Sequence, residues 1–148
     1  MEALILAVGR ARGGPEAELT ADRLARFTRT GRPLGLGPGR LVEVEDKRGR
    51  GPGAEGALLL AAAPQGAALV ALDERGRSLD SPGFARRLAD WRDEGRHTVA
   101  LALGGADGHA AAVRDRADLV LSFGPMVWPH MLARAMLAEQ LYRAEIGR

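Results

Sequence analysis

Cysteine is absent from the 148 residues of this sequence, and its absence excludes several kinds of site at once. No disulfide, no thiolate metal site and no cysteine nucleophile can form. The sequence also lacks any apolar run near the roughly 20 residues that a membrane span requires. Residues 1–8 are apolar but only about a strand long, and Glu2 stands where a signal peptide carries positive charge. We therefore expect a soluble, cytoplasmic protein without a membrane partner.

Lysine and asparagine are scarce too, since Lys47 is the one lysine among 21 basic residues and no asparagine occurs. With 20 glycines and many alanines, this bias is typical of a GC-rich coding sequence. It also makes arginine, which contacts phosphate through two parallel hydrogen bonds, the main cation available for nucleic acid. The basic residues nearly balance 19 acidic ones, so the net charge is only +2 although the pI is about 9.9. This balance argues against a non-specific binder of nucleic acid.

Length and composition indicate one globular domain over residues 1–148. Hydrophobic residues make up 46% and charged residues 27%, close to the averages of folded proteins, so we do not expect extended disorder. Short apolar runs alternate with longer amphipathic segments along the whole chain. We predict strands at 3–8, 41–45, 67–72, 98–103 and 119–122, and helices at 16–30, 54–63, 81–94, 109–116 and 129–145.

The alternation of strands and helices predicts both the fold class and the place of a site. Five strand–helix units without an internal repeat are typical of an α/β domain with a mainly parallel sheet and helices on both faces. Ligands of such sheets bind beyond the carboxyl ends of the strands. The loops after Leu72, Leu103 and Ser122 are therefore the candidate binding loops.

Glycines follow the apolar strand at 98–103 directly, in the segment GGADGH at 104–109. A glycine lets the backbone approach a ligand because no Cβ stands in the way. The spacing matches neither G-x-G-x-x-G nor GxxxxGK[ST], so neither a dinucleotide fingerprint nor a Walker loop is present. A tight turn between strand and helix explains the glycines equally well.

Two polar segments allow both a functional and a structural interpretation. In LDERGR at 72–77, the adjacent carboxylates Asp73 and Glu74 look catalytic, but acidic residues beside arginine in a turn are more often solvated. In DKRGRGPG at 46–53, the clustered positive charge suits a solvated loop or a loop that contacts phosphate. The three histidines of the chain are too scattered for a metal triad: His97, His109 and His130.

The segment FGPMVWPH at 123–130 is an apolar loop with two prolines that leads into the last helix. Apolar loops with Trp and Met become buried or bind something flat and apolar. The helix at 131–146 has a broad apolar face, which suits a dimer interface as well as a core. No Ser–His–Asp ordering indicates a hydrolase, so the residues by themselves predict a ligand-binding α/β domain.

GGADGH after a strand, followed by LSFGPMVWPHMLARAMLAEQLYRA, closely resembles the ribosomal RNA large subunit methyltransferase H family, a small branch of the SPOUT methyltransferases. LILAVGR at the start and LDERGR fit this family at the right separations, so the resemblance covers nearly the whole chain. It implies a SPOUT-type α/β knot, in which a mainly parallel sheet with helices on both faces carries a trefoil knot. It further implies S-adenosylmethionine as cofactor and a homodimer that shares its active site across the interface. The implied reaction is N3-methylation of a pseudouridine in 23S rRNA on the assembled ribosome, without a DNA partner.

The resemblance also assigns residues. His130 and Arg143 match the positions nearest the substrate nucleotide, where His130 would assist removal of the N3 proton and Arg143 would hold a phosphate or the developing uridine anion. The implied cofactor contacts fall on the three loops selected above, at Leu72, Gly104, Phe123, Gly124, Pro125, Met126, Val127 and Trp128.

Two departures from the family pattern bear on activity. Family members carry a short tail with Tyr, His and Arg after the last helix, which these 148 residues do not contain, so we expect cofactor binding but poor methylation until the tail is restored. The usual lysine in the turn after Leu72 is Arg77. The alternatives are another SPOUT methyltransferase that acts on tRNA, and a non-catalytic module of this fold that binds a ligand or the ribosome.

Overall fold

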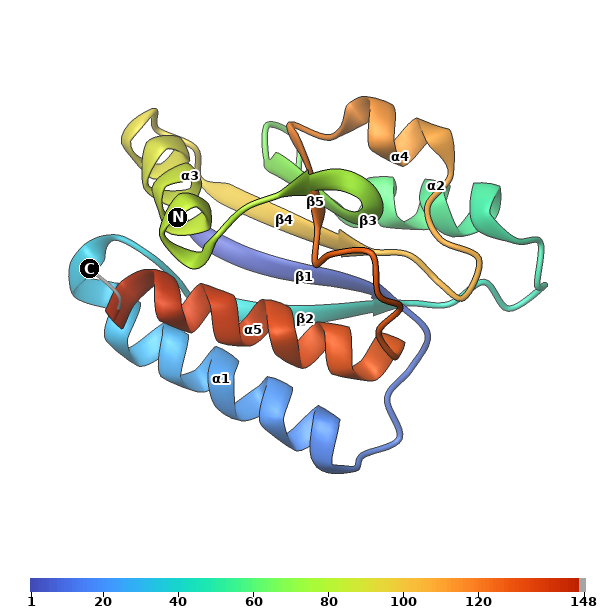
Figure 1. Ribbon diagram of the computed structural model, residues 1–148, viewed down its shortest axis with the longest axis horizontal. Helices are drawn as coiled ribbons and strands as arrows, with labels where there is room; N and C mark the ends of the chain where they lie inside the picture. Colours follow the sequence, from blue (N-terminus) through green and yellow to red (C-terminus); the bar gives the residue numbers. More distant parts are fainter. Residues whose placement is uncertain (147–148) are drawn as a thin grey trace.

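The structure is a computed structural model that describes residues 1–146 as one sheet between two layers of helices (Figure 1). The strands are β1 (Glu2–Val8), β2 (Gly39–Val44), β3 (Ala68–Ser78), β4 (Thr98–Leu103) and β5 (Leu119–Ser122). The helices are α1 (Pro15–Gly31), α2 (Pro52–Ala62), α3 (Ser81–Asp93), α4 (Ala111–Arg116) and α5 (His130–Ile146), with a 3-10 turn η1 (Arg32–Leu34) after α1. None of these described helices combines the length and the apolar character that crossing a bilayer requires.

The five strands form a parallel sheet in the order β2-β1-β4-β3-β5, which confirms the predicted fold class. The central strand β4 is buried along its whole length because helices cover both of its faces. Since all neighbours are parallel, all carboxyl ends of the strands meet at one edge of the sheet. The loops that follow β1, β2, β3, β4 and β5 therefore share that edge.

Alternate residues of each strand feed two separate cores. On β1, Ile5 belongs to the core under α1, α3 and α5, whereas Leu4 and Leu6 belong to the core under α2 and α4. Helix α5 packs against both α1 and α3 and supplies Leu137 and Leu141, which are fully buried. Much of the apolar face of α5 is thus used inside the monomer, and Figure 1 shows α5 beside α1 along most of its length.

The prediction of a turn at LDERGR is wrong, because β3 continues through it to Ser78. Leu72 and Arg77 both pair opposite Leu121 of β5, so the four residues between them bulge out of the ladder. The ladder can resume because residue 76 is glycine, where an added Cβ would lie 2.5 Å from the carbonyl oxygen of Val120. The extension of β3 could not be predicted from the sequence, since the polar residues of LDERGR are typical of a turn.

Candidate active site

A cavity of about 610 Å³ lies at the carboxyl ends of β3, β4 and β5. It is lined by the bulge of β3, by the glycine loop after β4 and by the apolar loop between β5 and α5, the three loops selected from the sequence. Pro125 and Arg143 are the two predicted site residues that do not line it. The others do: Leu72, Gly104, Phe123, Gly124, Met126, Val127, Trp128 and His130.

The glycine loop is a tight turn whose backbone forms one wall of the cavity. The amide of Gly108 donates a hydrogen bond of 3.0 Å to the carbonyl of Gly105. A Cβ at Gly104 would lie 2.8 Å from the carbonyl carbon of Gly108 and 3.1 Å from the amide nitrogen of His109. A Cβ at Gly105 would lie 2.6 Å from a carboxylate oxygen of Glu55. The turn itself therefore needs glycine at 104, whereas at 105 the flexible Glu55 side chain could move aside; at both positions the lack of a side chain leaves the backbone open to a ligand.

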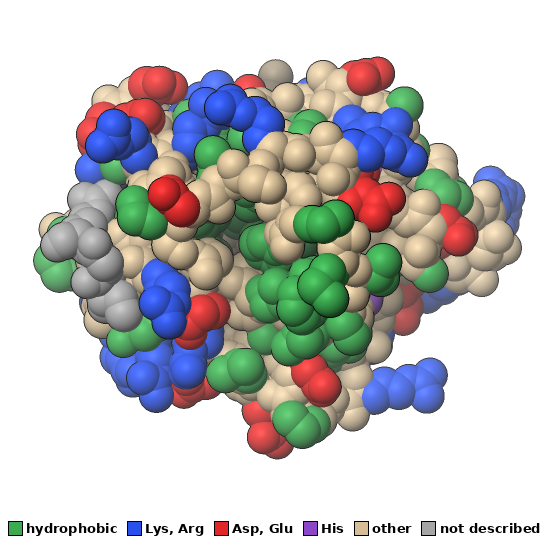
Figure 2. Space-filling model, viewed as in Figure 1, with side chains coloured by type: hydrophobic (Ala, Val, Ile, Leu, Met, Phe, Trp, Pro, Cys, Tyr) green, Lys and Arg blue, Asp and Glu red, His purple; other side chains and the backbone are tan. Residues whose placement is uncertain are grey.

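The loop between β5 and α5 is apolar but not buried. Met126 is 72% exposed, Val127 89% and Trp128 41%. Figure 2 shows hydrophobic side chains gathered in the middle of this face, over the segment where Figure 1 places the start of α5. Of the two alternatives left open by the sequence, burial or binding of a flat apolar group, the exposure favours binding.

His130 begins α5 and faces the cavity in an uncharged state. Burial lowers the pKa of His130 because it disfavours the imidazolium, and the charge of Arg134 lowers this pKa further. A hydrogen bond with the backbone of Gly104 acts in the opposite direction but is the smallest of the three effects. Among the described residues, no group hydrogen-bonds to its buried Nε2 atom. The ring of His130 lines the cavity while Nε2 itself is closed off from solvent, and a neutral imidazole can accept a proton at its unprotonated ring nitrogen.

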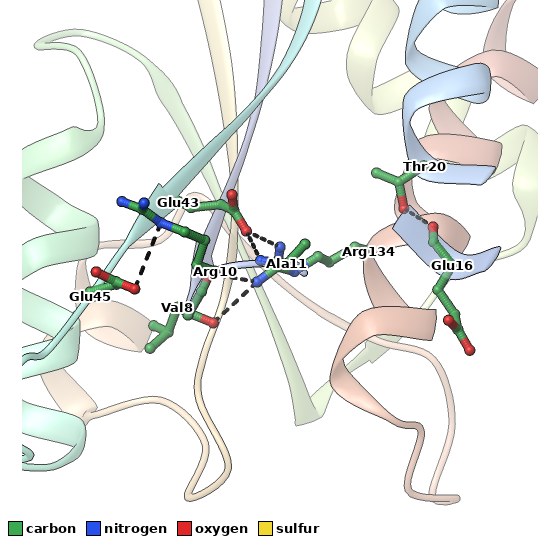
Figure 3. A network of polar contacts seen from close by, with 9 residues as sticks. Val8, Arg10, Ala11, Glu16, Thr20, Glu43, Glu45 and Arg134 are labelled. Atoms are coloured by element: carbon green, nitrogen blue, oxygen red, sulfur yellow. Dashed lines mark hydrogen bonds and ion pairs between the residues drawn. The ribbon is translucent and has the colours of Figure 1, made fainter. Parts of the chain in front are cut away.

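Arg134 lies one turn after His130 and anchors the start of α5 to the sheet (Figure 3). Its side chain is only 1% exposed. Nη1 donates to Oε2 of Glu43 at 2.7 Å, and Nη2 donates to the carbonyl oxygens of Val8 at 3.2 Å and Gly9 at 2.9 Å. The guanidinium thus ties α5 to the carboxyl ends of β1 and β2 and limits movement of His130.

Glu43 is the acidic partner in this anchor. Its carboxylate also accepts a hydrogen bond of 2.6 Å from the amide of Ala11. Burial acts to raise the pKa of Glu43, but the hydrogen bonds from Arg134 and Ala11 outweigh it, so the pKa is lowered and the carboxylate stays charged. Sequence reasoning missed this pair. The one available signal was an arginine on the apolar side of the last helix.

Asp73 and His109 line the cavity and fix its wall. The side chain of Asp73 is 6% exposed, so the interpretation of a solvated acidic turn is wrong for this residue. Asp73 lies 3.8 Å from Nη1 of Arg114, which donates to the carbonyl of His109 at 2.7 Å. His109 hydrogen-bonds through Nε2 to the carbonyl of Ala102 at 2.9 Å, and burial lowers its pKa. These contacts hold the end of the glycine loop against β3 and β4.

Arg143 lies far from this cavity within one chain. It follows His130 by 13 residues on α5, which places it about 20 Å further along the helix axis. Its Nε lies 3.0 Å from Oε2 of Glu139, which also pairs with Arg23 of α1. The side chain of Arg143 is 58% exposed. One chain therefore does not bring Arg143 and His130 together.

Comparison with known proteins agrees with this architecture. The family described as "Predicted SPOUT methyltransferase" matches residues 1–146, and the chain belongs to this family of methyltransferases. Two relatives, from Ruegeria pomeroyi and Cereibacter sphaeroides, are named Ribosomal RNA large subunit methyltransferase H. They are 63% and 65% identical over 144 residues, and each match covers 97% of this chain and 92% of the relative. These matches confirm the resemblance found in the sequence. The trefoil knot is a feature that membership of this family implies.

Solved structures show weaker similarity. The SpoU methyltransferase AviRb from Streptomyces viridochromogenes, in complex with the cofactor AdoMet, is 17% identical with a TM-score of 0.45. The match covers 100% of this chain and 61% of that chain. Similarity of this extent is too low to bear on substrate or mechanism.

Proposed function

We propose that this chain uses S-adenosylmethionine to methylate N3 of a pseudouridine in the 23S rRNA of the assembled ribosome. One observation carries the proposal: a neutral histidine lines the same cavity as a glycine-rich loop and an exposed apolar loop. The names of the two relatives support the choice of ribosomal RNA as substrate.

The cavity suits the proposed cofactor in size and in chemistry. Its volume of about 610 Å³ lies within the range of cavities that enclose ligands of this size. Backbone groups at Gly104 are accessible to a polar moiety, and Phe123, Met126 and Trp128 offer apolar surface for an adenine ring. Bound S-adenosylmethionine would supply an electrophilic methyl group.

His130 provides the proton acceptor that the reaction needs. N3 of a uracil ring carries a proton that has to leave when the bond to the methyl carbon forms. Because its pKa is lowered, His130 is neutral near pH 7 and would take this proton at its unprotonated ring nitrogen as a general base. Arg134 holds the first turn of α5 and so keeps the imidazole in position.

The proposed activity is tested directly on ribosomes that lack the modification. The chain, as given and with a tail carrying Tyr, His and Arg added, is incubated with them and with S-adenosylmethionine carrying a labelled methyl group, and the label is located by mass spectrometry of nucleosides. We expect label on N3 of pseudouridine in 23S rRNA, and little on deproteinised 23S rRNA. Label on tRNA, or on no RNA even after a tail with Tyr, His and Arg is added to the chain, would overturn the proposal.

Replacement of His130 by Gln should remove methyl transfer without removing the cofactor. We expect a single-turnover rate about 100- to 10,000-fold lower, because a general base is lost. Affinity for S-adenosylhomocysteine, measured by calorimetry, should change less than about threefold, since the amide has a similar volume. An unchanged rate would exclude His130 as the base.

The pH profile of the wild type gives a second readout on the same residue. The pKa of His130 is lowered from its ordinary value of 6.5, so the neutral base predominates at pH 7. The rate should therefore be flat near neutrality and fall as the pH drops below 6.5 through the lowered pKa. This acid limb should be missing from the His130→Gln variant.

Arg143 can serve the substrate only if a second copy of the chain brings it to the cavity. Within one chain it lies about 20 Å along α5 from His130. We therefore place Arg143 at the partner's cavity in a homodimer with shared sites. Met131, Leu132 and Met136 on α5 are half-buried in the monomer and offer apolar surface for that contact.

Replacement of Arg143 by Ala should slow methyl transfer, with a loss of about 2–4 kcal/mol in transition-state stabilisation. The affinity for the cofactor should stay nearly unchanged. Arg143→Lys should restore only part of the rate, because an ammonium does not reproduce the planar fork. Mixing the Arg143→Ala and His130→Gln chains tests the shared site, because each mixed dimer would contain one intact site. No recovery on mixing would contradict it, as would a monomer in sedimentation at micromolar concentration. A structural role beside Glu139 would cost only a few tenths of a kcal/mol in stability.

A further inference from the structure

The loops after β1 and β2 carry basic side chains at the same sheet edge as the cavity. Arg12 lies in the first loop, and Lys47, Arg48 and Arg50 lie in the second; we refer to these four residues as the basic edge. All four side chains are exposed. Strands in a sheet are about 4.8 Å apart, so the ends of β1 and β2 lie about 5 and 10 Å from that of β4. The basic edge is therefore close to the glycine loop.

The side chains of the basic edge have no acidic partner among residues 1–146. The neighbouring Arg10 is different, since it lies 3.8 Å from Glu45. Other arginines also contact carboxylates: Arg23, Arg26, Arg40, Arg92, Arg96, Arg114, Arg134 and Arg143. In a chain with a net charge of only +2, this edge thus gathers uncompensated positive charge.

The loop after β2 is folded by its own backbone contacts. The carbonyl of Asp46 accepts a hydrogen bond of 3.1 Å from the amide of Gly49, and its carboxylate accepts one of 3.0 Å from the amide of Gly51. Both glycines have positive φ, at 60° and 94°, which other residues rarely adopt. The carboxylate of Asp46 is therefore used within the loop, while the three cations project outward.

A shallow hollow of about 490 Å³ lies between this loop and α2. Lys47, Arg48 and Arg50 line one side of it together with Glu45 and Asp46, whose carboxylates lie near Arg10 and within the loop, and Ala57 and Leu58 of α2 form an apolar side. Leu58 is 37% exposed. Cations opposite a small apolar surface suit a sugar–phosphate backbone, in which charged phosphates alternate with less polar riboses.

We propose that the basic edge binds phosphates of the RNA strand next to the target nucleotide. This inference rests on the proposed function, since it assigns a second contact for the same substrate. Arginine binds phosphate in a bidentate manner, and unpaired exposed arginine loses no existing ion pair on binding. A local cluster of this kind lets a chain of nearly zero net charge bind a polyanion at one edge and not elsewhere.

The test compares a variant in which three cations of the basic edge are neutralised with a control variant in which three arginines far from this edge are neutralised. The variant is Lys47→Gln/Arg48→Gln/Arg50→Gln, and the control is Arg29→Gln/Arg32→Gln/Arg86→Gln. The control residues are exposed, have no ion pair among the described residues and lie away from this edge, on α1, η1 and α3. Both variants change the net charge equally. Binding to ribosomes is measured by sedimentation between 50 and 200 mM salt, together with kcat and KM for methylation.

We expect the basic-edge variant to raise KM for ribosomes by about tenfold or more and to lower the salt slope of binding by about three. Its kcat and its affinity for S-adenosylhomocysteine should stay at the wild-type level, and the control should stay within about twofold throughout. Equal weakening of both variants, or of neither, would overturn the inference. A wild type that binds ribosomes through this edge but does not methylate them would contradict the proposed function alone.

Discussion

A Gly104→Val variant should lose affinity for S-adenosylmethionine by at least about 100-fold, or about 2.8 kcal/mol, since the backbone that contacts the ligand can no longer keep its position. The added Cβ would lie 2.8 Å from the backbone of Gly108, which cannot move aside as a flexible side chain can. The turn between Gly104 and His109 has to open, and the backbone wall of the cavity is displaced. Calorimetry with S-adenosylmethionine and S-adenosylhomocysteine measures the loss.

Gly53 offers a matched control for this substitution. A Cβ at Gly53 would meet nothing within 4 Å, and its φ is not positive. Gly53→Ala should therefore keep wild-type affinity, whereas Gly104→Ala should already weaken binding. Gly53→Ala and the two Gly104 variants should all unfold cooperatively in circular dichroism, because none of these substitutions touches either hydrophobic core. Wild-type affinity in Gly104→Val would remove the glycine loop from the site.

Replacement of Arg134 by Ala should lower the free energy of unfolding by about 3 kcal/mol, the lower end of the range for breaking a buried ion pair. The carboxylate of Glu43 would lose its partner, and the carbonyls of Val8 and Gly9 would lose a donor. Glu43 is 26% exposed, so water compensates part of its lost charge interaction. Urea unfolding with a constant m-value measures the change.

Two controls separate this effect from a general loss of charge on α5. Arg143→Ala removes an exposed ion pair from the same helix and should cost less than about 1 kcal/mol. Adding Glu43→Gln to Arg134→Ala should cost less than the sum of the single changes, because the two groups interact directly. The acid limb of the pH profile should also move to higher pH in Arg134→Ala, since Arg134 lowers the pKa of His130. Additive effects and an unmoved limb would exclude the anchoring role.

Local patterns in the sequence were sufficient to predict the order of the strands and helices and the three loops that line the cavity. The strands at 98–103 and 119–122 have the predicted bounds, because a continuous apolar run between polar residues specifies a buried strand. The glycine loop and the apolar loop were also selected from the sequence. Glycines directly after a strand and an apolar segment bounded by prolines are both typical of loops that bind a ligand at the end of a strand. Parallel strands then place all such loops at one edge.

Contacts between distant residues decided the rest. The extension of β3 depends on Gly76 fitting against Val120, and the anchor of α5 depends on Glu43 and Arg134, which are 91 residues apart. Neither pair has a local signature, since each residue alone looks like an ordinary polar or turn position. The separation of Arg143 from His130, in contrast, follows already from the predicted helix at 129–145, since 13 residues of helix span about 20 Å. Sequence periodicity thus determined the type and order of the strands and helices, whereas the end of β3 and the burial and pairing of charges followed from tertiary packing, because the free energy of a charge depends on neighbours that the sequence does not place.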